Sequence, residues 1–244
     1  MSLRNKILKL LYPNIGDIIV LEKYQSIYFA IPKVANTSLK LVCAHLLHSK
    51  RDSSLVQQTD WPTFFRDVKS ARILRGRGKG ILIKKRHVRE YKEFWKFCFV
   101  RNPWDRLVSC FKEKVDRYSK DDFSNWSLTS PGFSRRGFYP GMSFEEFGLR
   151  VCELPDALAD RHFKSQYLFL TDWKERLLVD YVGHFENLEE DFSYVLRKMG
   201  LGKIELPHVS MSHRKRYQDY YSPKLIKIVG RRYRKDIGFF RYSF

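Results

Sequence analysis

The sequence predicts an α/β fold in which helices flank a central parallel sheet, and three observations support this. Short apolar runs of strand length, such as 27–31 and 95–100, alternate with longer segments that have helical periodicity. Each of these two runs passes through a polar, basic turn directly into a helical pattern. No internal repeat interrupts the alternation. Such strands form parallel sheets covered on both faces, which bind ligands at the carboxyl ends of their strands.

The elements follow in order along the chain. Residues 18–21 and 27–31 predict two successive strands, because both runs are apolar and a short turn region separates them. A helix is expected from Asn36, since apolar residues recur from Leu39 to Leu47 at helical spacing. The later expected elements are a weak helix at 61–74, a strand at 95–100, a helix from Pro103 to Tyr118, a long functional loop at 119–142, helices at 143–153 and 159–169, a strand at 180–185, and a helix with a capping-box-like start from Asn187 to near Gly200.

The composition predicts one basic globular domain over residues 1–244. Hydrophobic residues make up 43% of the chain and aromatic residues 16%, which is too much for a disordered basic tail. The 46 Lys and Arg exceed the 27 Asp and Glu, giving a formal net charge of +19, which favours polyanionic partners. The four cysteines show no metal-ligand spacing, so they are expected to be reduced and mostly buried.

The first polar turn has the residues of an anion site. Residues 31–38 read Ile-Pro-Lys-Val-Ala-Asn-Thr-Ser and follow the first of the two apolar runs. Lys33 supplies a positive charge, and the following helix would direct its free N–H groups to the same place. Asn36, Thr37 and Ser38 add short polar side chains. The signature GxxxxGK[ST] of P-loop NTPases is absent, so the turn predicts a phosphate or sulfate site of another kind.

A second segment has the same organisation. Residues 97–109 read Phe-Cys-Phe-Val-Arg-Asn-Pro-Trp-Asp-Arg-Leu-Val-Ser, again an apolar strand, a basic turn and a helix. Within it, Arg106 is either a phosphate contact or an ion-pair partner of Asp105. Two such segments predict a ligand with two separated anionic groups.

Together the two segments, PKVANTS and FVRNPWDRLVS, closely resemble the nucleotide motifs of the carbohydrate sulfotransferase superfamily. Residues 160–166, 182–192 and 233–242 continue the resemblance, which covers nearly the whole chain from about Ile27. It implies a P-loop-kinase-like sulfotransferase fold and an enzyme that needs no metal. It also implies 3′-phosphoadenosine 5′-phosphosulfate (PAPS) as the sulfate donor, adenosine 3′,5′-bisphosphate (PAP) as the product, and a carbohydrate hydroxyl as the acceptor.

The resemblance also implies roles for individual residues. Lys33 would stabilise the negative charge that develops on the oxygen between phosphorus and sulfur as the bond from this oxygen to sulfur breaks. Arg101 would hold the 3′-phosphate with its planar fork, and Ser109 would add a hydroxyl two helical turns further on. The implied donor ligands are Lys33, Ala35, Asn36, Thr37, Ser38, Arg101 and Ser109.

A base must also deprotonate the acceptor hydroxyl. His87 is the first candidate, because related enzymes carry a histidine just upstream of the second motif and histidine titrates near working pH. His162 and Gln166, four residues apart on an expected helix face, are tentative acceptor ligands. His162 is also an alternative base, and Glu186 is a further alternative.

Other interpretations stay open on the sequence alone. The charge of +19 fits a basic nucleic-acid-binding protein, although no motif of such proteins accompanies it. A catalytically inactive family member that only binds PAP is also consistent. Segments 48–80 and 118–142 match no motif, so the acceptor is not specified. The apolar run within residues 1–13 is too short for a membrane span. The eukaryotic enzymes that the chain resembles are typically anchored in the Golgi, so this short run, together with the initial Met, favours a cytoplasmic, bacterial-type enzyme over a trimmed Golgi-lumen enzyme.

Overall fold

The chain divides into two compact units. The computed structural model describes residues 16–48, 82–118, 126, 130–207 and 215–244. One unit, here called the sheet unit, comprises residues 14–100 and 169–211. The other, the helical unit, comprises 101–168 and 212–244 together with 1–13. The expected helix at 61–74 lies outside the described residues.

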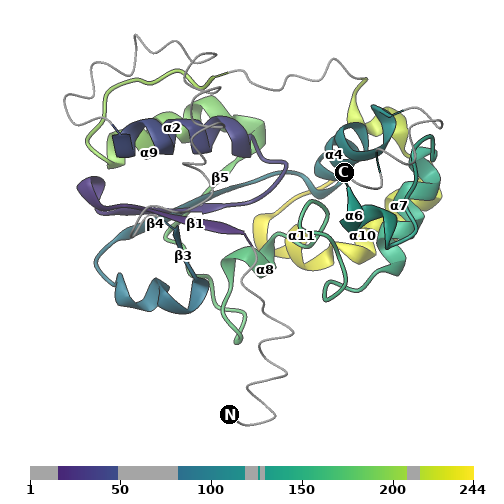
Figure 1. Ribbon diagram of the computed structural model, residues 1–244, viewed down its shortest axis with the longest axis horizontal. Coiled ribbons are helices and arrows are strands. Elements are labelled where there is room, and N and C mark those ends of the chain that lie inside the picture. The colour runs from purple at the N-terminus through teal and green to yellow at the C-terminus, as the bar shows by residue number, and fades with distance from the viewer. Residues whose placement is uncertain (1–15, 49–81, 119–125, 127–129, 208–214) are drawn as a thin grey trace. The chain divides into compact units, whose positions relative to one another are not determined.

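The described part of the sheet unit is built around a five-stranded mixed sheet (Figure 1). Its strands are β1 (Asp17–Leu21), β2 (Ser26–Ala30), β3 (Leu82–Ile83), β4 (Trp95–Val100) and β5 (Tyr181–His184), in the order β3-β1-β2-β4-β5. The neighbours β2, β4 and β5 run parallel, as expected, and the α/β class is confirmed. β1 is antiparallel to β2 because only the short helix η1 (Glu22–Tyr24) and Gln25 connect them, too few residues for a crossover.

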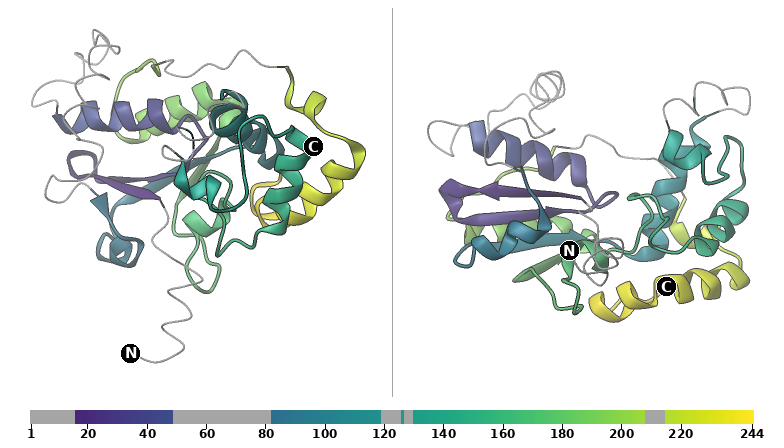
Figure 2. Two further views of the ribbon diagram at one scale, coloured as in Figure 1. Left: turned by 45° about the vertical axis from the view of Figure 1, so that its right-hand side comes forward. Right: turned by 60° about the horizontal axis from the view of Figure 1, so that its bottom comes forward.

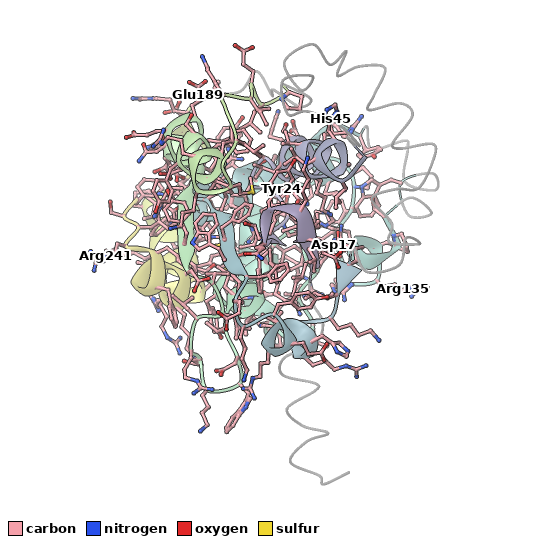
Figure 3. The ribbon with its side chains drawn as sticks, turned by 90° about the vertical axis from the view of Figure 1, so that its left-hand side faces the viewer. Asp17, Tyr24, His45, Arg135, Glu189 and Arg241 are labelled. Atoms are coloured by element: carbon pink, nitrogen blue, oxygen red, sulfur yellow. The ribbon has the colours of Figure 1, made fainter. Side chains whose placement is uncertain are left out.

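Helices cover both faces of this sheet. Helices α2 (Asn36–His48) and α9 (Leu188–Lys198) lie on one face, where Figure 3 labels His45 and Glu189. The 3-10 helix η4 (Lys85–Glu90) lies on the other face (Figures 1 and 2). All five residues of β2 are buried, which explains why this strand reads as a continuous apolar run instead of an alternating one.

The connection between β5 and α9 differs in detail from the expectation. Helix η7 (Phe185–Asn187) precedes α9, and the Asn187 side chain makes no capping bond, so the expected capping box is wrong. Asp191 takes its place: its carboxylate accepts from the backbone N–H of His184 at 2.6 Å and from the Tyr181 hydroxyl at 2.8 Å. Both bonds tie the helix directly to the strand that precedes it.

The helical unit packs around an aromatic core. Its elements are α4 (Pro103–Phe111), the π-helical turn η5 (Lys112–Asp116), α6 (Pro131–Ser134), α7 (Phe144–Glu153), η8 (Tyr217–Tyr220), α10 (Pro223–Arg232) and α11 (Arg234–Phe240), and α8 (Tyr167–Leu170) spans the sequence boundary between the units. Trp126, Phe133 and Phe138 are buried in this core with Phe147. Part of the expected loop 119–142 therefore packs into this core.

The helix expected over 159–169 is reduced to α8. Before α8 the chain forms consecutive turns, in which some backbone N–H groups bond to carboxylates, while Lys164 N bonds to the Asp160 carbonyl at 2.8 Å. Asp160 accepts from His162 N at 2.9 Å, and Asp156 accepts from Ser165 N at 2.9 Å. Hydrophobic spacing could not reveal this competition, because it depends on side chains that fold back onto their own backbone.

Two other observations complete the fold. All four cysteines are free thiols, and Cys43, Cys98 and Cys110 are buried, as expected. No helix within the described residues has the length and apolar character that a membrane span requires.

Candidate active site

The turn between β2 and α2 has an unusual backbone. Lys33 has φ +74° and Ala35 has φ +49°, in the left-handed region that non-glycine residues avoid at a cost of about 1–2 kcal/mol each. Val34, between them, is completely buried and fixes the turn in the core. Left-handed residues at such a turn aim successive N–H groups into one concavity, which is how backbone nests bind anions. The sequence lacks P-loop glycines, yet the backbone adopts conformations that glycine usually provides.

The first turn of α2 continues this arrangement. The first intrahelical bond runs from Leu39 N to the Ala35 carbonyl at 3.0 Å, so the N–H groups of residues 36–38 precede the helical bonding pattern. Thr37 is exposed, and Asn36 and Ser38 are half-buried. These N–H groups lie directly after the strained turn, at the carboxyl end of a parallel strand, where anions are favoured.

Asn36 contributes a polar group that the described residues leave unsatisfied. Its side-chain oxygen Oδ1 is buried and has no hydrogen-bond partner within the described part of the chain. The oxygen and nitrogen of such an amide are assigned from their partners, so rotation by 180° presents an NH₂ donor in the same place. A phosphate oxygen would satisfy that donor. The turn therefore fits an anionic group.

Ser38 has a structural bond that the sequence did not reveal. Its hydroxyl donates to the carbonyl of Pro207 at 2.5 Å, which ties the segment after α9 to the start of α2. The hydroxyl proton is thus engaged, and the group that Ser38 offers to an anion in this arrangement is its backbone N–H. Lys33, the predicted charge of the turn, is half-buried.

Arg101 directly follows β4 and is tightly held within the helical unit. Its guanidinium Nε donates to Asp105 Oδ2 at 2.8 Å, and both side chains are almost fully buried. Its backbone is held by Gln166: Arg101 N donates to Gln166 Oε1 at 3.0 Å, and Gln166 Nε2 donates to the Arg101 carbonyl at 2.8 Å. Gln166 is completely buried, so in this arrangement it positions Arg101 and does not face an acceptor.

Arg106 is a structural residue. Its Nη1 donates to the carbonyl of Lys164 at 2.8 Å and its Nη2 to that of Arg161 at 3.2 Å. Asp105, one of the partners that the sequence offered for Arg106, pairs with Arg101 at 2.8 Å. Ser109 is the one residue of α4 that is not buried, so its hydroxyl is accessible from outside the core.

Asp236 supports the same region from α11. Its carboxylate is completely buried and accepts from Gln166 N at 2.8 Å and Tyr167 N at 2.9 Å. Burial raises the pKa of Asp236 to about 6, although the two backbone bonds and the nearby Arg106 oppose the shift. A chain of contacts thus runs from Asp236 through Gln166 to Arg101. Sequence reasoning gave Asp236 no role, although residues 233–242 were recognised as a block.

The two histidine candidates have different surroundings. His87, on η4, accepts at Nε2 from Arg86 Nε at 3.0 Å, and its Nδ1 lies 2.7 Å from Glu90 Oε1. Both ring nitrogens are therefore occupied by neighbours on the same short helix. That helix lies on the sheet face opposite to α2, the helix that Lys33 precedes (Figure 1). Within the sheet unit, the structure groups residues 33–38 in one turn and places His87 on a separate element.

His162 has only one ring nitrogen engaged by the described residues. Its Nδ1 lies 2.6 Å from Asp160 Oδ1, and its side chain is 22% exposed. Burial lowers the pKa of His162 below its ordinary value, Lys114 and Arg161 add to this effect, and Asp160 opposes it. The imidazole is therefore neutral at physiological pH, with its ring oriented by a carboxylate. A base that is oriented by an acidic partner has this arrangement.

A known family accounts for these features. The model of the sulfotransferase family matches residues 16–243, which include both turns and all the later blocks. The chain belongs to the sulfotransferase family. The match confirms the family that the two motifs indicated. No solved structure matches the chain.

Individual relatives are distant. The chain is 25% identical over 246 residues to carbohydrate sulfotransferase 10 of Mus musculus, an alignment that covers 93% of this chain and 67% of the mouse protein. It is 24% identical over 169 residues to carbohydrate sulfotransferase 10 of Xenopus laevis, and this match spans 62% of the chain but only about half, 48%, of the relative. An uncharacterized protein of Archaeoglobus fulgidus is 31% identical over 106 residues, which are 43% of this chain and 67% of the archaeal protein.

Proposed function

We propose that this protein is a transferase that moves the sulfuryl group of PAPS to a hydroxyl of a carbohydrate. The observation that carries the proposal is the strained turn at Lys33 and Ala35, which leads into the N-terminus of α2 in a chain matched by the sulfotransferase family model. The printed names of the mouse and Xenopus relatives support carbohydrate as the acceptor class.

The turn would hold the phosphosulfate end of the donor. Its backbone N–H groups and the Asn36 amide would bind the equatorial oxygens, because these groups are fixed before the donor arrives. Lys33 would act on the bridging oxygen, where negative charge appears as the bond from oxygen to sulfur breaks. The acceptor oxygen forms the new bond to sulfur from the opposite side, and PAP leaves with the electron pair.

The 3′-phosphate would be held by Arg101 and Ser109. An arginine presents its N–H donors in a planar fork that suits a phosphate, and the bond from Nε to Asp105 orients this side chain. Gln166 fixes the Arg101 backbone from behind. The bisphosphate would then gain charged hydrogen bonds that AMP, which lacks a 3′-phosphate, does not form.

A histidine would accept the proton of the acceptor hydroxyl. His87 was the first candidate from its place before the second motif. The local geometry favours His162, because its Nδ1 side is oriented by Asp160 and its Nε2 makes no hydrogen bond with the described residues, whereas both nitrogens of His87 are occupied. We therefore propose His162 as the base and retain His87 as the alternative.

The test compares two ligands and one reaction. Calorimetry should show that PAP binds far more tightly than AMP. The Arg101→Ala variant should bind PAP about tenfold or more weakly and should bind AMP with nearly unchanged affinity, since a charged hydrogen bond contributes about 1.5–3 kcal/mol. Labelled PAPS should then transfer sulfate to at least one member of a panel of glycans. PAP binding without any transfer would indicate an inactive member. Salt-sensitive nucleic-acid binding with no PAP binding would overturn the proposal in favour of a nucleic-acid-binding protein.

A further inference from the structure

A hydrogen-bonded turn extends away from the sheet between α8 and β5 (Figures 1 and 2). Its two sides are joined by a bridge between Thr171 and Leu177. Asp172 N also donates to the Arg176 carbonyl at 2.9 Å. The Asp172 carboxylate fixes the tip, because it accepts from the backbone N–H groups of Lys174 at 2.8 Å and Arg176 at 3.1 Å. The turn therefore presents its outer side chains from a defined backbone.

Two large apolar side chains of this turn are exposed to solvent. Trp173 and Leu177 are each 43% exposed, although tryptophan is highly buried on average. The Nζ of Lys174 lies 4.8 Å from the centre of the Trp173 ring, so a cation accompanies the indole. Tryptophan and lysine are the side chains that occupy the boundary between water and lipid, where the ring lies at the level of the headgroups and the lysine reaches the polar layer.

Helix η4 adds cations on the same face of the sheet as this turn (Figures 1 and 2). Because a 3-10 helix has three residues per turn, Lys85 and Val88 share one face, and this face is the less exposed one. Arg86 and Arg89 share another face, which is exposed. The Nη2 of Arg89 lies 3.8 Å from Asp172 Oδ2, so the helix and the turn are neighbours in space.

The exposed charges of these two segments are mostly positive. The side chain of Asp172 is only 8% exposed and is neutralised by Arg176, whose Nε and Nη2 donate to Oδ2 at 2.9 and 2.7 Å. Within residues 84–93 and 171–177, the exposed basic side chains are Lys84, Arg86, Arg89, Lys92, Lys174 and Arg176, and the exposed acidic ones are Glu90 and Glu93. These basic side chains and the two exposed apolar ones form what we call the tip surface. Its charge attracts an anionic partner.

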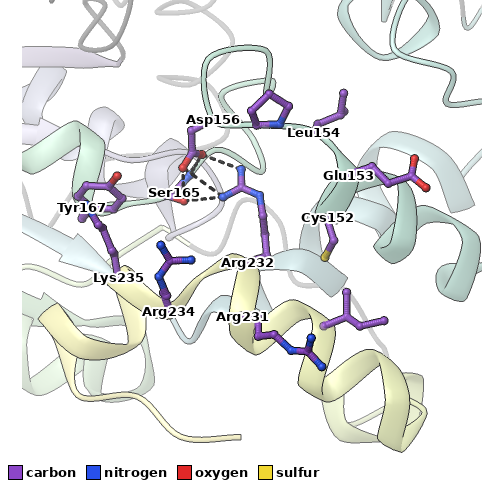
Figure 4. A pocket seen from close by; sticks show the side chains of 12 residues that line it. Cys152, Glu153, Leu154, Asp156, Ser165, Tyr167, Arg231, Arg232, Arg234 and Lys235 are labelled. Carbon is purple, nitrogen blue, oxygen red and sulfur yellow. Dashed lines mark hydrogen bonds and ion pairs between the residues drawn. The ribbon is translucent and has the colours of Figure 1, made fainter.

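The shape of the tip surface distinguishes it from the basic cavity of the helical unit. That cavity has a volume of about 660 Å³, and its Arg232 is only 10% exposed and bonded to Asp156 and Ser165 (Figure 4). Such a cavity encloses a ligand of limited size. The turn instead extends outward with its apolar side chains exposed, so it suits a partner with a broad surface that admits an apolar tip.

An anionic bilayer meets both requirements. Its headgroups present negative charge across a plane, and its interfacial layer takes up tryptophan and leucine side chains. A folded acidic protein fits less well, because a stable interface buries about 800 Å² on each partner around an apolar core, whereas the tip surface offers two large apolar side chains. A nucleic acid could stack on Trp173 but has no apolar layer for Leu177.

We propose that the tip surface docks this protein onto an anionic lipid bilayer, with Trp173 and Leu177 in the headgroup layer and the basic side chains against the lipid phosphates. The contact is peripheral, because only the end of a turn and one face of a short helix enter it. The inference does not depend on the proposed function, since it uses no residue assigned to donor binding.

The first test uses the full chain and vesicles of equimolar phosphatidylcholine and phosphatidylglycerol, with binding measured by sedimentation. The wild type should bind these vesicles at least about tenfold more tightly than vesicles of phosphatidylcholine alone. Arg86→Gln/Lys174→Gln should lower the affinity for the mixed vesicles about tenfold or more, since each cation near an anionic surface contributes about fivefold.

The matched control is Arg197→Gln/Lys198→Gln. It also removes two exposed charges, but from the last turn of α9, which lies on the opposite face of the sheet (Figure 1). Its affinity should fall less than about twofold, because salt screens charges that lie away from the bilayer. If both double variants lower the affinity equally, the attraction is a general property of the basic protein and the proposal is overturned.

Two exposed leucines test the apolar part of the contact. Leu177→Ala should weaken vesicle binding about threefold or more, because it removes apolar surface from the headgroup layer. Leu158→Ala is the control, since Leu158 is 57% exposed in the helical unit and lies outside the tip surface. Its affinity should be unchanged. Equal effects of the two substitutions would contradict insertion of the turn.

Tryptophan fluorescence locates the tip within the bilayer. In mixed vesicles whose phosphatidylcholine is brominated on its acyl chains, the wild-type fluorescence should be quenched on binding. Trp173→Phe should retain vesicle binding, because phenylalanine is also an apolar ring, but should lose the quenching. Quenching that persists in this variant would overturn the proposal. Tighter binding to a single-stranded oligonucleotide than to the vesicles, lost in Trp173→Ala, would assign the surface to nucleic acid instead.

Discussion

Gln166 holds the backbone of Arg101 with both ends of its side-chain amide. The oxygen accepts from Arg101 N at 3.0 Å and the nitrogen donates to the Arg101 carbonyl at 2.8 Å. The amide thus bonds to both backbone polar groups of the residue that follows β4. The backbone of Gln166 is held in turn by the buried carboxylate of Asp236. The orientation of a predicted phosphate ligand therefore depends on two residues that lie 65 and 70 positions apart from their partners in the sequence.

This relationship leads to a prediction for Gln166→Leu. The variant removes the two bonds from the Gln166 amide to the buried backbone of Arg101, which should lower the free energy of unfolding by about 1–3 kcal/mol. The variant should also lower the affinity for PAP more than the affinity for AMP, because Arg101 loses its fixed orientation. Urea unfolding and calorimetry with both ligands measure the two effects. A variant that loses stability but binds PAP normally would show that Gln166 has no part in positioning Arg101.

The strained turn predicts a different result for two glycine substitutions. Ala35→Gly should stabilise the fold by about 0.5–1 kcal/mol, because glycine removes the left-handed penalty but loses more backbone entropy on folding. Its kcat should be nearly unchanged. Lys33→Gly keeps a favourable turn conformation but removes the positive charge, so its kcat should fall about 10²–10³-fold with a smaller effect on donor affinity.

Thermal unfolding and steady-state kinetics of both variants check this prediction, and Ala35→Gly is the control for the backbone change. If Lys33→Gly retains near-normal kcat, or if its whole defect lies in KM, Lys33 has no role in the chemical step.

The base assignment predicts a specific pH dependence. His162 acts as a base only when neutral, and its pKa is lowered, so the acid-side limb of kcat against pH should lie below the ordinary histidine value of about 6.5. His162→Gln should remove this limb and reduce kcat about 10²–10⁴-fold, with PAP affinity retained. His87→Gln should leave the limb in place. The reverse pattern, with the limb lost only in His87→Gln, would assign the base to His87.

Asp236 predicts a pH effect on stability. Its pKa in the fold is raised to about 6 from an ordinary value near 3.8, so the fold binds its proton more tightly than the unfolded chain does. The resulting stabilisation is complete below pH 3.8 and is lost as the pH rises through about 6, with a total change of up to about 3 kcal/mol.

Asp236→Asn cannot titrate and should lack this component. The difference in unfolding free energy between the wild type and this variant, from urea titrations between pH 4.5 and 7.5, should therefore decrease as the pH rises. A difference that is constant with pH, or that increases, would contradict the raised pKa.

The strands and turns that depend on local pattern could be predicted from the amino-acid sequence. The apolar runs at 27–31 and 95–100 correspond to β2 and β4, and both are followed by the expected helices, because a strand buried on both faces needs a continuous apolar sequence. The two turn motifs also identified the family, which the match over residues 16–243 confirms. These features depend on neighbours in the chain, so they are visible without coordinates.

The pairing of the polar side chains became visible only in the folded chain. Spacing predicted that His162 and Gln166 share a helix face, but the chain forms turns there, and Asp160 and Asp236 accept from the backbone N–H groups of His162 and Gln166. Gln166 is buried against Arg101 by bonds between residues 65 positions apart, whereas His162 is held at Nδ1 by the nearby Asp160. A hydrogen bond between residues 70 positions apart leaves no periodic signal, because its energy depends on where the fold places two side chains and not on their spacing in the sequence.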